Sequence, residues 1–192
     1  MNQIEETLFH LVNSLSGRYA FLDGVMFWLS DSSTWILAGS AFYIYAYAAK
    51  KKDLIILFWC AIICVAFSDL ISFELIKPLV GRERPCWILS KSILMDGKCG
   101  GSYGFTSNHA ANSFAVWAAV VKKNGIQSKM AKVCLALALL ISMSRVYLGV
   151  HFVGDVVGGA LLGAAVSSVL WSQGLDSWAT IISNRTGAKR LN

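Results

Sequence analysis

The sequence predicts an all-α integral membrane protein with five transmembrane helices and one or two N-terminal interfacial amphipathic helices. Of its 192 residues, 56% are hydrophobic, and the mean hydropathy of +0.57 is far above that of an ordinary soluble domain. The apolar residues gather into runs that we interpret as membrane spans. Short lysine blocks at residues 50–52 and 122–123 separate these runs, as is typical of cytoplasmic loops.

Residues 1–31 are expected to form the interfacial helices. Apolar positions such as Leu8, Leu11 and Leu22 have helical spacing, but the segment is interrupted at residues 16–18. Each piece is too short to cross about 30 Å of hydrocarbon, so we expect both to lie along the membrane surface. The start of the chain is acidic where a cleavable signal peptide would be basic, so no such signal is expected.

Five spans are expected within one membrane-embedded domain that covers residues 1–192. They comprise residues 35–49, 54–76, 108–121, 130–148 and 152–171, and they form a catalytic helical core over residues 33–171. In the last span, Gly154-x-x-x-Gly158 and Gly159-x-x-x-Gly163 allow close helix approach. Residues 172–192 are expected to form a frayed cytoplasmic tail.

Residues 77–105 are expected to form a long loop, because they contain both prolines and several glycines. A loop of this length in a compact protein is usually functional. With the lysine blocks placed inside, this loop and the turns at 107–109 and 148–151 all lie on the outer face. The loop is nevertheless basic, with Lys77, Arg82, Arg84, Lys91 and Lys98. Because outer loops usually lack cations, this one is expected to bind an anion.

The formal net charge of +6 is interpreted as topology and contact with anionic lipid. No aromatic residues that could stack on bases are interleaved with the basic blocks, so nucleic acid is not an expected partner. The expected partners are the lipid bilayer and a lipid substrate, and no obligate protein partner is implied.

The five cysteines show no C-x-x-C pattern of a metal or redox site. Cys60, Cys64 and Cys134 fall within apolar runs and are expected to be small core residues. Cys86 and Cys99 flank the polar loop, and a disulfide between them is possible if the loop is extracytoplasmic.

Three polar groups meet at the predicted outer face: Lys77 with Arg84, Ser107 with His109, and Arg145 with His151 and Asp155. Charges next to apolar runs are costly unless they are paired or used. If the chain is helical from His151 onward, His151 and Asp155 lie four residues apart on one face and can hydrogen-bond. That pair is a candidate nucleophile or base with its orienting carboxylate. A single histidine could be a packed polar residue, but the matching cations favour a site.

These groups carry three motifs with recognisable spacing. Lys77-Pro-Leu-Val-Gly-Arg-Glu-Arg84-Pro85 fits K-x6-R-P, Ser107-Asn108-His109 fits the block usually written P-S-G-H, and Ser144-Arg145-x5-His151-x3-Asp155 fits S-R-x5-H-x3-D. In these blocks the chain resembles the type 2 phosphatidic acid phosphatase family, whose phosphate pocket is shared with vanadium haloperoxidases. The resemblance covers about residues 33–171. Thr106 and Asn108 stand where the family usually has proline and glycine.

The resemblance implies a lipid phosphate or diphosphate phosphatase that needs no metal and no cofactor. It assigns His151 as the nucleophile that forms a phosphohistidine, Asp155 as its orienting group, and His109 as the acid that protonates the leaving oxygen and then activates water. The phosphate would be bound by cationic side chains, a hydroxyl and the start of a helix, namely Lys77, Arg84, Ser107, Asn108 and Arg145.

The implied substrates are lipid A 1-phosphate, undecaprenyl diphosphate, phosphatidylglycerol phosphate and phosphatidate. The implied location is a bacterial-type inner membrane, with the site facing the periplasm or exterior. Three alternatives stay open at this point. One is a metal-dependent hydrolase with His109, His151 and Asp155 as zinc or iron ligands, although clustered cations would repel the metal. The others are a serine hydrolase using Ser107 or Ser144 and a non-enzymatic transporter or scaffold.

Overall fold

The computed structural model describes residues 3–95, 99–101 and 103–185, and all the secondary-structure elements named within these residues are helices. The prediction of an all-α protein is therefore confirmed for the described residues. In chain order the elements are α1 (Gln3–Asn13), α2 (Ala20–Ser30), α3 (Ser32–Ala48), α4 (Lys52–Leu70), η1 (Ile71–Ile76), α5 (Lys77–Val80), α6 (Pro85–Ile88), α7 (Asn108–Asn124), α8 (Lys129–Tyr147), α9 (Val153–Ser172) and α10 (Leu175–Arg185).

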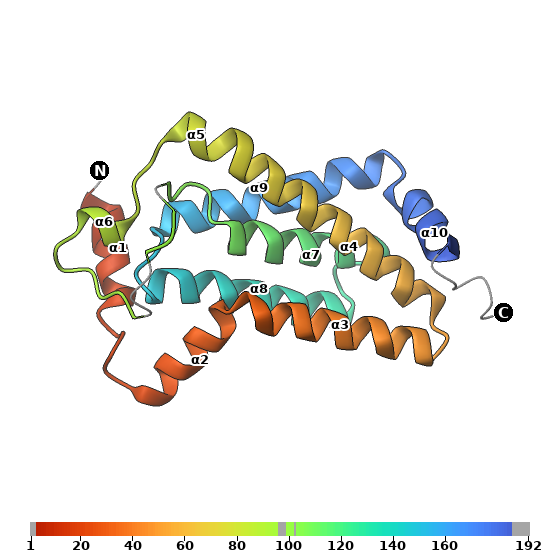
Figure 1. Ribbon diagram of the computed structural model, residues 1–192, viewed down its shortest axis with the longest axis horizontal. Coiled ribbons are helices and arrows are strands. Elements are labelled where there is room, and N and C mark those ends of the chain that lie inside the picture. The colour runs from red at the N-terminus through yellow and green to blue at the C-terminus, as the bar shows by residue number, and fades with distance from the viewer. Residues whose placement is uncertain (1–2, 96–98, 102, 186–192) are drawn as a thin grey trace.

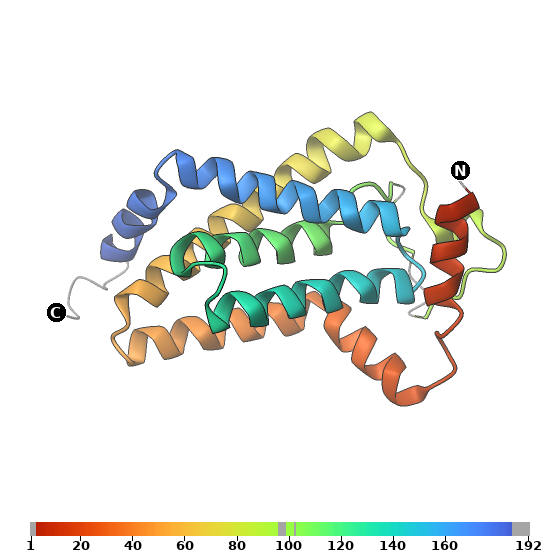
Figure 2. The same cartoon turned by 180° about the vertical axis from the view of Figure 1, so that it is seen from behind.

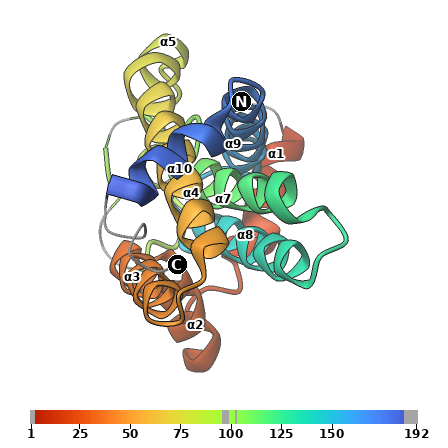
Figure 3. The same ribbon diagram turned by 90° about the vertical axis from the view of Figure 1, so that its right-hand side faces the viewer.

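Five helices, α3, α4, α7, α8 and α9, run along the long axis of the molecule (Figure 1). Seen along this axis, α7 lies in the middle and contacts α4, α8 and α9 (Figure 3). The contact of α7 with α9 is close because Gly159 and Gly163 face it. A Cβ on either glycine would overlap main-chain atoms of α7, so the glycine pattern predicted from the sequence marks this helix crossing.

Three helical runs among the described residues are long and apolar enough to cross a membrane: Lys52–Val80, Lys129–Tyr147 and Val153–Ser172. The first joins α4, the π-helical segment η1 and α5 into one continuous helix. The other two long-axis helices, α3 and α7, have 17 residues each.

The predicted loop at residues 77–105 begins too early, because the helix continues to Val80 and ends at Gly81. Gly81 has a φ of 59° and donates its N–H to the carbonyl of Lys77 over 2.9 Å. Pro78 does not end the helix because it follows η1, where the α-helical hydrogen-bond pattern is already interrupted. A further short helix, α6, begins with Pro85 at its first turn.

The predicted frayed tail is wrong over residues 175–185, which form α10. Leu175 and Ala179 lie four residues apart and are 3% and 0% exposed, packed with Ile56 and Cys60 of α4. A narrow apolar stripe on an otherwise polar helix is enough for this packing, and the overall polarity of the segment hides it. Residues 186–192 of the predicted tail lie outside the described residues.

The two predicted N-terminal helices are present as α1 and α2, with 11 residues each. Helix α1 packs across one end of the bundle, beside the start of α9 (Figure 2). Phe9 is fully buried there against Phe152, with ring centroids 5.5 Å apart. The side chain of Asn13 donates 2.9 Å hydrogen bonds to the carbonyls of Ile93 and Tyr147. These contacts fix α1 at the end of the bundle that carries the predicted site.

Candidate active site

A pocket of ≈ 510 Å³ opens at this end of the bundle, where α5 and α8 end and α7 begins. Six residues singled out from the sequence line it: Lys77, Arg84, Asn108, His109, Arg145 and His151. They come from segments far apart in the chain, so the structure brings together the three motifs that the sequence kept separate.

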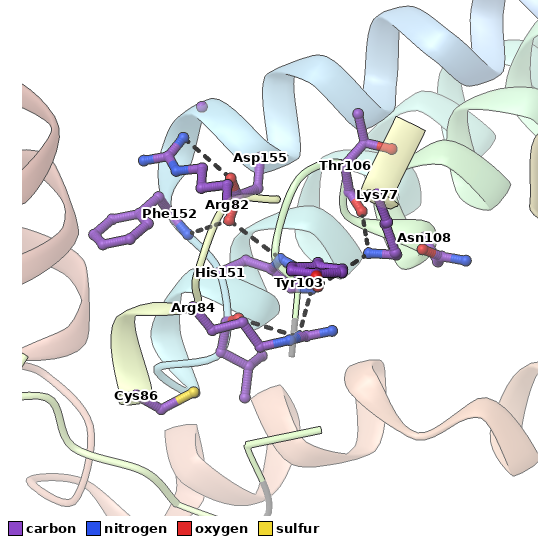
Figure 4. A network of polar contacts seen from close by, with 12 residues as sticks. Lys77, Arg82, Arg84, Cys86, Tyr103, Thr106, Asn108, His151, Phe152 and Asp155 are labelled. Atoms are coloured by element: carbon purple, nitrogen blue, oxygen red, sulfur yellow. Dashed lines mark hydrogen bonds and ion pairs between the residues drawn. The ribbon is translucent and has the colours of Figure 1, made fainter. Parts of the chain in front are cut away.

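His151 is 2% exposed and is held through both ring nitrogens (Figure 4). Its Nδ1 lies 3.3 Å from Oδ2 of Asp155, and its Nε2 lies 3.0 Å from Nη1 of Arg84. Because a guanidinium only donates, Nε2 must accept, and the proton of the neutral ring must be on Nδ1, facing the carboxylate. Burial, together with the charges of Arg84, Arg145 and Lys77, lowers the pKa of His151 well below its usual range. His151 therefore presents an unprotonated Nε2 to the pocket.

Asp155 lies behind His151 and is fully buried. Its Oδ2 also accepts the main-chain N–H of Phe152 over 3.0 Å, so Asp155 helps to cap the first turn of α9. Its Oδ1 lies 3.1 Å from Nη1 of Arg82. With both oxygens engaged, the carboxylate is fixed in the orientation that receives Nδ1–H of His151.

Lys77 and Arg84 line the pocket and also donate hydrogen bonds to main-chain carbonyls near the start of α7 and in the loop before it. Nζ of Lys77 donates to the carbonyls of Thr106 (2.7 Å) and Tyr103 (3.4 Å). Nε of Arg84 donates to the carbonyl of Gly101 over 2.7 Å. Both side chains are nearly buried, at 7% and 9% exposed, so their positive charges face the pocket with little access to water.

His109 and Arg145 meet at the junction of α2 and α3. Nε2 of His109 lies 2.9 Å from the carbonyl of Ser30 and 3.5 Å from Oγ of Ser32, and Nη1 of Arg145 donates to Oγ of Ser30. A carbonyl only accepts, so Nε2 of His109 carries a proton. The side chain of Asp31 caps α3 by accepting the main-chain N–H groups of Ser33 and Thr34, which fixes this junction. No pattern in the sequence indicates that the junction belongs to the site.

Ser107 and Asn108 of the middle motif differ in their position relative to the pocket. Ser107 is fully buried and does not line the pocket, and its N–H donates to the carbonyl of Asp155 over 3.0 Å. Its assignment as a phosphate ligand therefore stays a prediction. Asn108 does line the pocket, and its amide is held by Asp69 (2.6 Å) and Ser72 (3.0 Å). The side chain that replaces the family's glycine is thus anchored on α4 and η1.

Sequence reasoning missed several pocket-lining residues, namely Phe73, Glu74, Pro78, Gly101 and Tyr103. Phe73 and Glu74 lie one helical turn before Lys77, on the same face, so helical spacing from a known site residue could have found them. Gly101 and Tyr103 lie in the loop before α7, where no helical spacing relates them to a known site residue. Lys98, predicted among the loop cations, lies outside the described residues.

A disulfide joins Cys86 and Cys99, whose Cα atoms are 5.9 Å apart. It connects α6 to the segment whose Gly101 carbonyl accepts from Arg84. The disulfide therefore restrains the part of the loop that positions this cation.

The geometry gives the two other hydrolase alternatives little support. In the part of the chain that the structure describes, no three His, Cys, Asp or Glu side chains are grouped as metal ligands. The Oγ of Ser144 donates to the carbonyl of Ile141 over 2.7 Å, and the buried Oγ of Ser107 has no hydrogen-bond partner among these residues. Neither serine is paired with a histidine as a serine nucleophile would be.

The fold and the pocket define a helical protein that has helices long and apolar enough to cross a membrane and, at one end of its bundle, a pocket lined by three cations and two histidines. The sequence profile of the PAP2 superfamily matches residues 55–179, and the chain belongs to this family. The resemblance drawn from the three motifs is thereby confirmed.

Relatives with assigned names are similar over different shares of their length. The lipid A 4'-phosphatase of Porphyromonas gingivalis is 27% identical over 88% of this chain and 72% of its own length. The lipid A 4'-phosphatase of Bacteroides thetaiotaomicron is 34% identical over 54% of this chain and 49% of its own. The crystal structure of Aquifex aeolicus LpxE has the same fold, with a TM-score of 0.66, 20% identity and coverage of 89% of this chain and 96% of that one.

Proposed function

We propose that this chain is a lipid phosphatase that hydrolyses a headgroup phosphate through a phosphohistidine on His151. The observation that carries the proposal is the state of His151, whose unprotonated Nε2 faces a pocket lined by Lys77, Arg84 and Arg145. Phosphoryl transfer asks a protein mainly for positioning and for charge stabilisation, and this arrangement offers both. Membership of the PAP2 superfamily and the names of the relatives support the same activity.

In the proposed reaction, Nε2 of His151 attacks phosphorus, and the bond from phosphorus to the lipid oxygen breaks. His109 enters this step as the imidazolium and gives one of its two ring protons to that leaving oxygen, which leaves a neutral imidazole, and the cations of the pocket bind the non-bridging oxygens. Asp155 stabilises the positive charge that the phosphorylated ring acquires. A water molecule then gives a proton to His109 and attacks phosphorus, which releases inorganic phosphate and restores both histidines. Every charge in the scheme is held by this chain's own residues, so no cofactor is invoked.

The proposed membrane arrangement has five spans, with α3 and α7 added to the three long apolar runs. Helices of 17 residues rise about 25 Å, a little less than the hydrocarbon core, and both lie alongside the longer helices in the bundle (Figure 1). The turn from α3 to α4 and the end of α7, which carry the lysines at 50–52 and 122–123, lie at the end of the bundle opposite α1 and the pocket (Figure 1), which supports a pocket on the outer face of a bacterial-type inner membrane. Helices α1 and α10 both dock on the bundle, which supports one domain over the whole chain.

The proposed substrate is a phosphate monoester on a glycolipid, of which the 4'-phosphate of lipid A is the first candidate. The support comes from the two named relatives. The other lipids implied by the family resemblance are lipid A 1-phosphate, undecaprenyl diphosphate, phosphatidylglycerol phosphate and phosphatidate. Phosphate release from all of these candidates is to be compared in one assay.

The test is phosphate release by the purified protein from each of these lipids in mixed detergent micelles. We expect release from at least one lipid, unchanged by EDTA, and loss of release in His151→Ala and His109→Ala. Loss of activity with EDTA and recovery with zinc would support the metal-dependent alternative. Release by His151→Ala equal to that of the wild type would refute the phosphohistidine mechanism and leave the transporter or scaffold alternative.

A further inference from the structure

Arg82 lies beside the pocket but is not part of its lining. Its guanidinium is directed away from the pocket, toward Asp155 (Figure 4). Nη1 lies 3.1 Å from Oδ1 of Asp155, and Nη2 lies 2.6 Å from Oε2 of Glu5. The guanidinium carbon also lies 4.6 Å from the centre of the Phe152 ring, a cation–π contact. The loop cation expected to bind an anion therefore binds two carboxylates of the protein itself.

Glu5 of α1 makes a second contact at the same place. Its Oε1 accepts the main-chain N–H of Gly154 over 3.1 Å, at the first turn of α9. A Cβ at residue 154 would overlap this carboxylate and displace it, so glycine leaves room for the contact. The acid is also suited to a helix N-terminus, where main-chain N–H groups favour negative charge. Glu5 thus links α1, Arg82 and the helix that carries Asp155.

The ion pairs of Arg82 with Glu5 and with Asp155 extend the chain of contacts that begins at His151. Asp155 is fully buried, and Oδ2 is taken by His151 and by the N–H of Phe152. Oδ1 is paired with Arg82 through an ion pair, and without Arg82 it would be a buried charge without a counter-ion, which is costly and would favour rotation of the carboxylate. Arg82 has side-chain contact with water, at 24% exposed, so a second partner is needed to hold its fork in one place, and Glu5 supplies it.

We propose that Glu5 and Arg82 are positioning residues for the reaction, with Glu5 holding Arg82, Arg82 holding Asp155, and Asp155 holding the imidazole of His151. This inference rests on the proposed phosphatase function. It makes α1, which contributes no residue to the pocket lining, a necessary part of the catalytic apparatus. It also separates Arg82 from Lys77 and Arg84, because those two face the phosphate and Arg82 faces the nucleophile's support.

The test compares kcat and KM for Arg82→Met, Arg82→Lys, Glu5→Gln and the double variant Glu5→Gln/Arg82→Met, using the full chain in mixed micelles. A misplaced nucleophile costs about 10²-fold, so Arg82→Met is expected to lower kcat by about this factor with KM within about 2-fold of the wild type. Arg82→Lys keeps the charge without the fork and is expected to recover part of kcat. Glu5→Gln is expected to lower kcat less than Arg82→Met.

The double variant is expected to have the kcat of Arg82→Met alone, because Glu5 acts through Arg82. The matched control is Glu6→Gln, which makes the same change one residue along α1, where Glu6 lies 3.8 Å from His10. Its kinetics are expected to equal those of the wild type. The inhibition constant of inorganic phosphate, measured for every variant, reports whether the pocket still binds an anion, and it is expected to change less than 3-fold.

Three results would overturn the inference. A raised KM with unchanged kcat in Arg82→Met would make Arg82 a substrate contact. Equal kinetics for Glu5→Gln and Glu6→Gln, or additive losses in the double variant, would remove Glu5 from the chain of contacts. A loss of inhibition by inorganic phosphate in parallel with kcat, in Arg82→Lys as well as Arg82→Met, would show a structural role only. These results differ from failure of the proposed function, in which the wild type itself releases no phosphate from any lipid.

Discussion

Nη1 of Arg84 donates to Nε2 of His151 over 3.0 Å, so a cation expected to bind phosphate covers the atom expected to attack it. An incoming phosphate would take the guanidinium from His151 and expose the lone pair in the same movement. Arg84 keeps a second hold through Nε on the carbonyl of Gly101, so the side chain can change one partner without leaving the pocket. In this structure the proposed nucleophile is thus covered by a group that is itself proposed to bind phosphate.

Arg84→Ala is expected to lower kcat about 10²–10³-fold, because one donor to the transition-state charge is lost. Arg84→Lys is expected to recover only part of this, since an ammonium cannot hold Gly101 and a phosphate as a fork does. Steady-state phosphate release measures both. Lys129→Ala is the control, because Lys129 is an exposed cation at the start of α8. If Arg84→Ala stayed within about 3-fold of the control, Arg84 would have no part in the chemistry.

The depressed pKa of His151 predicts that stability falls on acidification. The unfolded chain has a histidine with an ordinary pKa of about 6.5, whereas burial and the nearby cations lower the pKa in the folded state. Below about pH 6.5 the unfolded state therefore binds more protons, so the stability that is present above this pH is lost as the pH falls. We expect the thermal midpoint in detergent to fall on the acid side, and less steeply in His151→Gln. Parallel curves for the two proteins would contradict this assignment.

Asn108→Gly is expected to keep phosphate release within about 3-fold while lowering stability. The Asn108 side chain is held by Asp69 and Ser72 rather than projecting freely, so its removal leaves the pocket's charges in place. Loss of these hydrogen bonds costs about 1 kcal/mol, which corresponds to about 2–4 °C in the thermal midpoint of a protein of this size. Activity and midpoint are measured on the same preparation. A loss of activity beyond about 30-fold would make the amide a substrate ligand.

Removing the disulfide by Cys86→Ser/Cys99→Ser is expected to destabilise the protein by about 2–4 kcal/mol and to raise KM, because the segment that carries Gly101 is freed. Chemical denaturation and steady-state kinetics give the two values. The pairing itself is tested by mass spectrometry, where alkylation of Cys86 and Cys99 should require prior reduction. Two thiols that react without reduction would show that the bond is not formed.

Hydropathy and motif spacing predicted much of this protein because both are local signals. The predicted spans agree with α3, α4, α7, α8 and α9 to within a few residues at most ends, since apolar runs and lysine blocks mark the ends of such helices. The residues of the pocket were found because the three motifs sit at helix ends that a simple alternation of spans brings to one face. The continuation through Pro78 to Val80 was missed because a proline usually ends a helix.

The support of the site could not be predicted, because it comes from contacts between distant segments. His109 bonds the carbonyl of Ser30, 79 residues away, and Glu5 bonds the N–H of Gly154, 149 residues away. A main-chain carbonyl has no sequence identity to detect, and a single acid on an amphipathic helix resembles any solvated charge. Packing of α10 was missed for a related reason, since two apolar residues four apart are too few to stand out.

The contact of Glu5 with the first turn of α9 joins two segments that are synthesised at different times. The N–H that Glu5 binds is synthesised 149 residues after Glu5 itself. At about 5–20 residues per second, that interval is on the order of ten seconds, during which α1 lacks this partner. His151 and Asp155 arrive only with the last long helix. A chain that ends before His151 carries Lys77, Arg84 and Arg145 but neither the proposed nucleophile nor Asp155, so the proposed hydrolysis requires synthesis to reach α9.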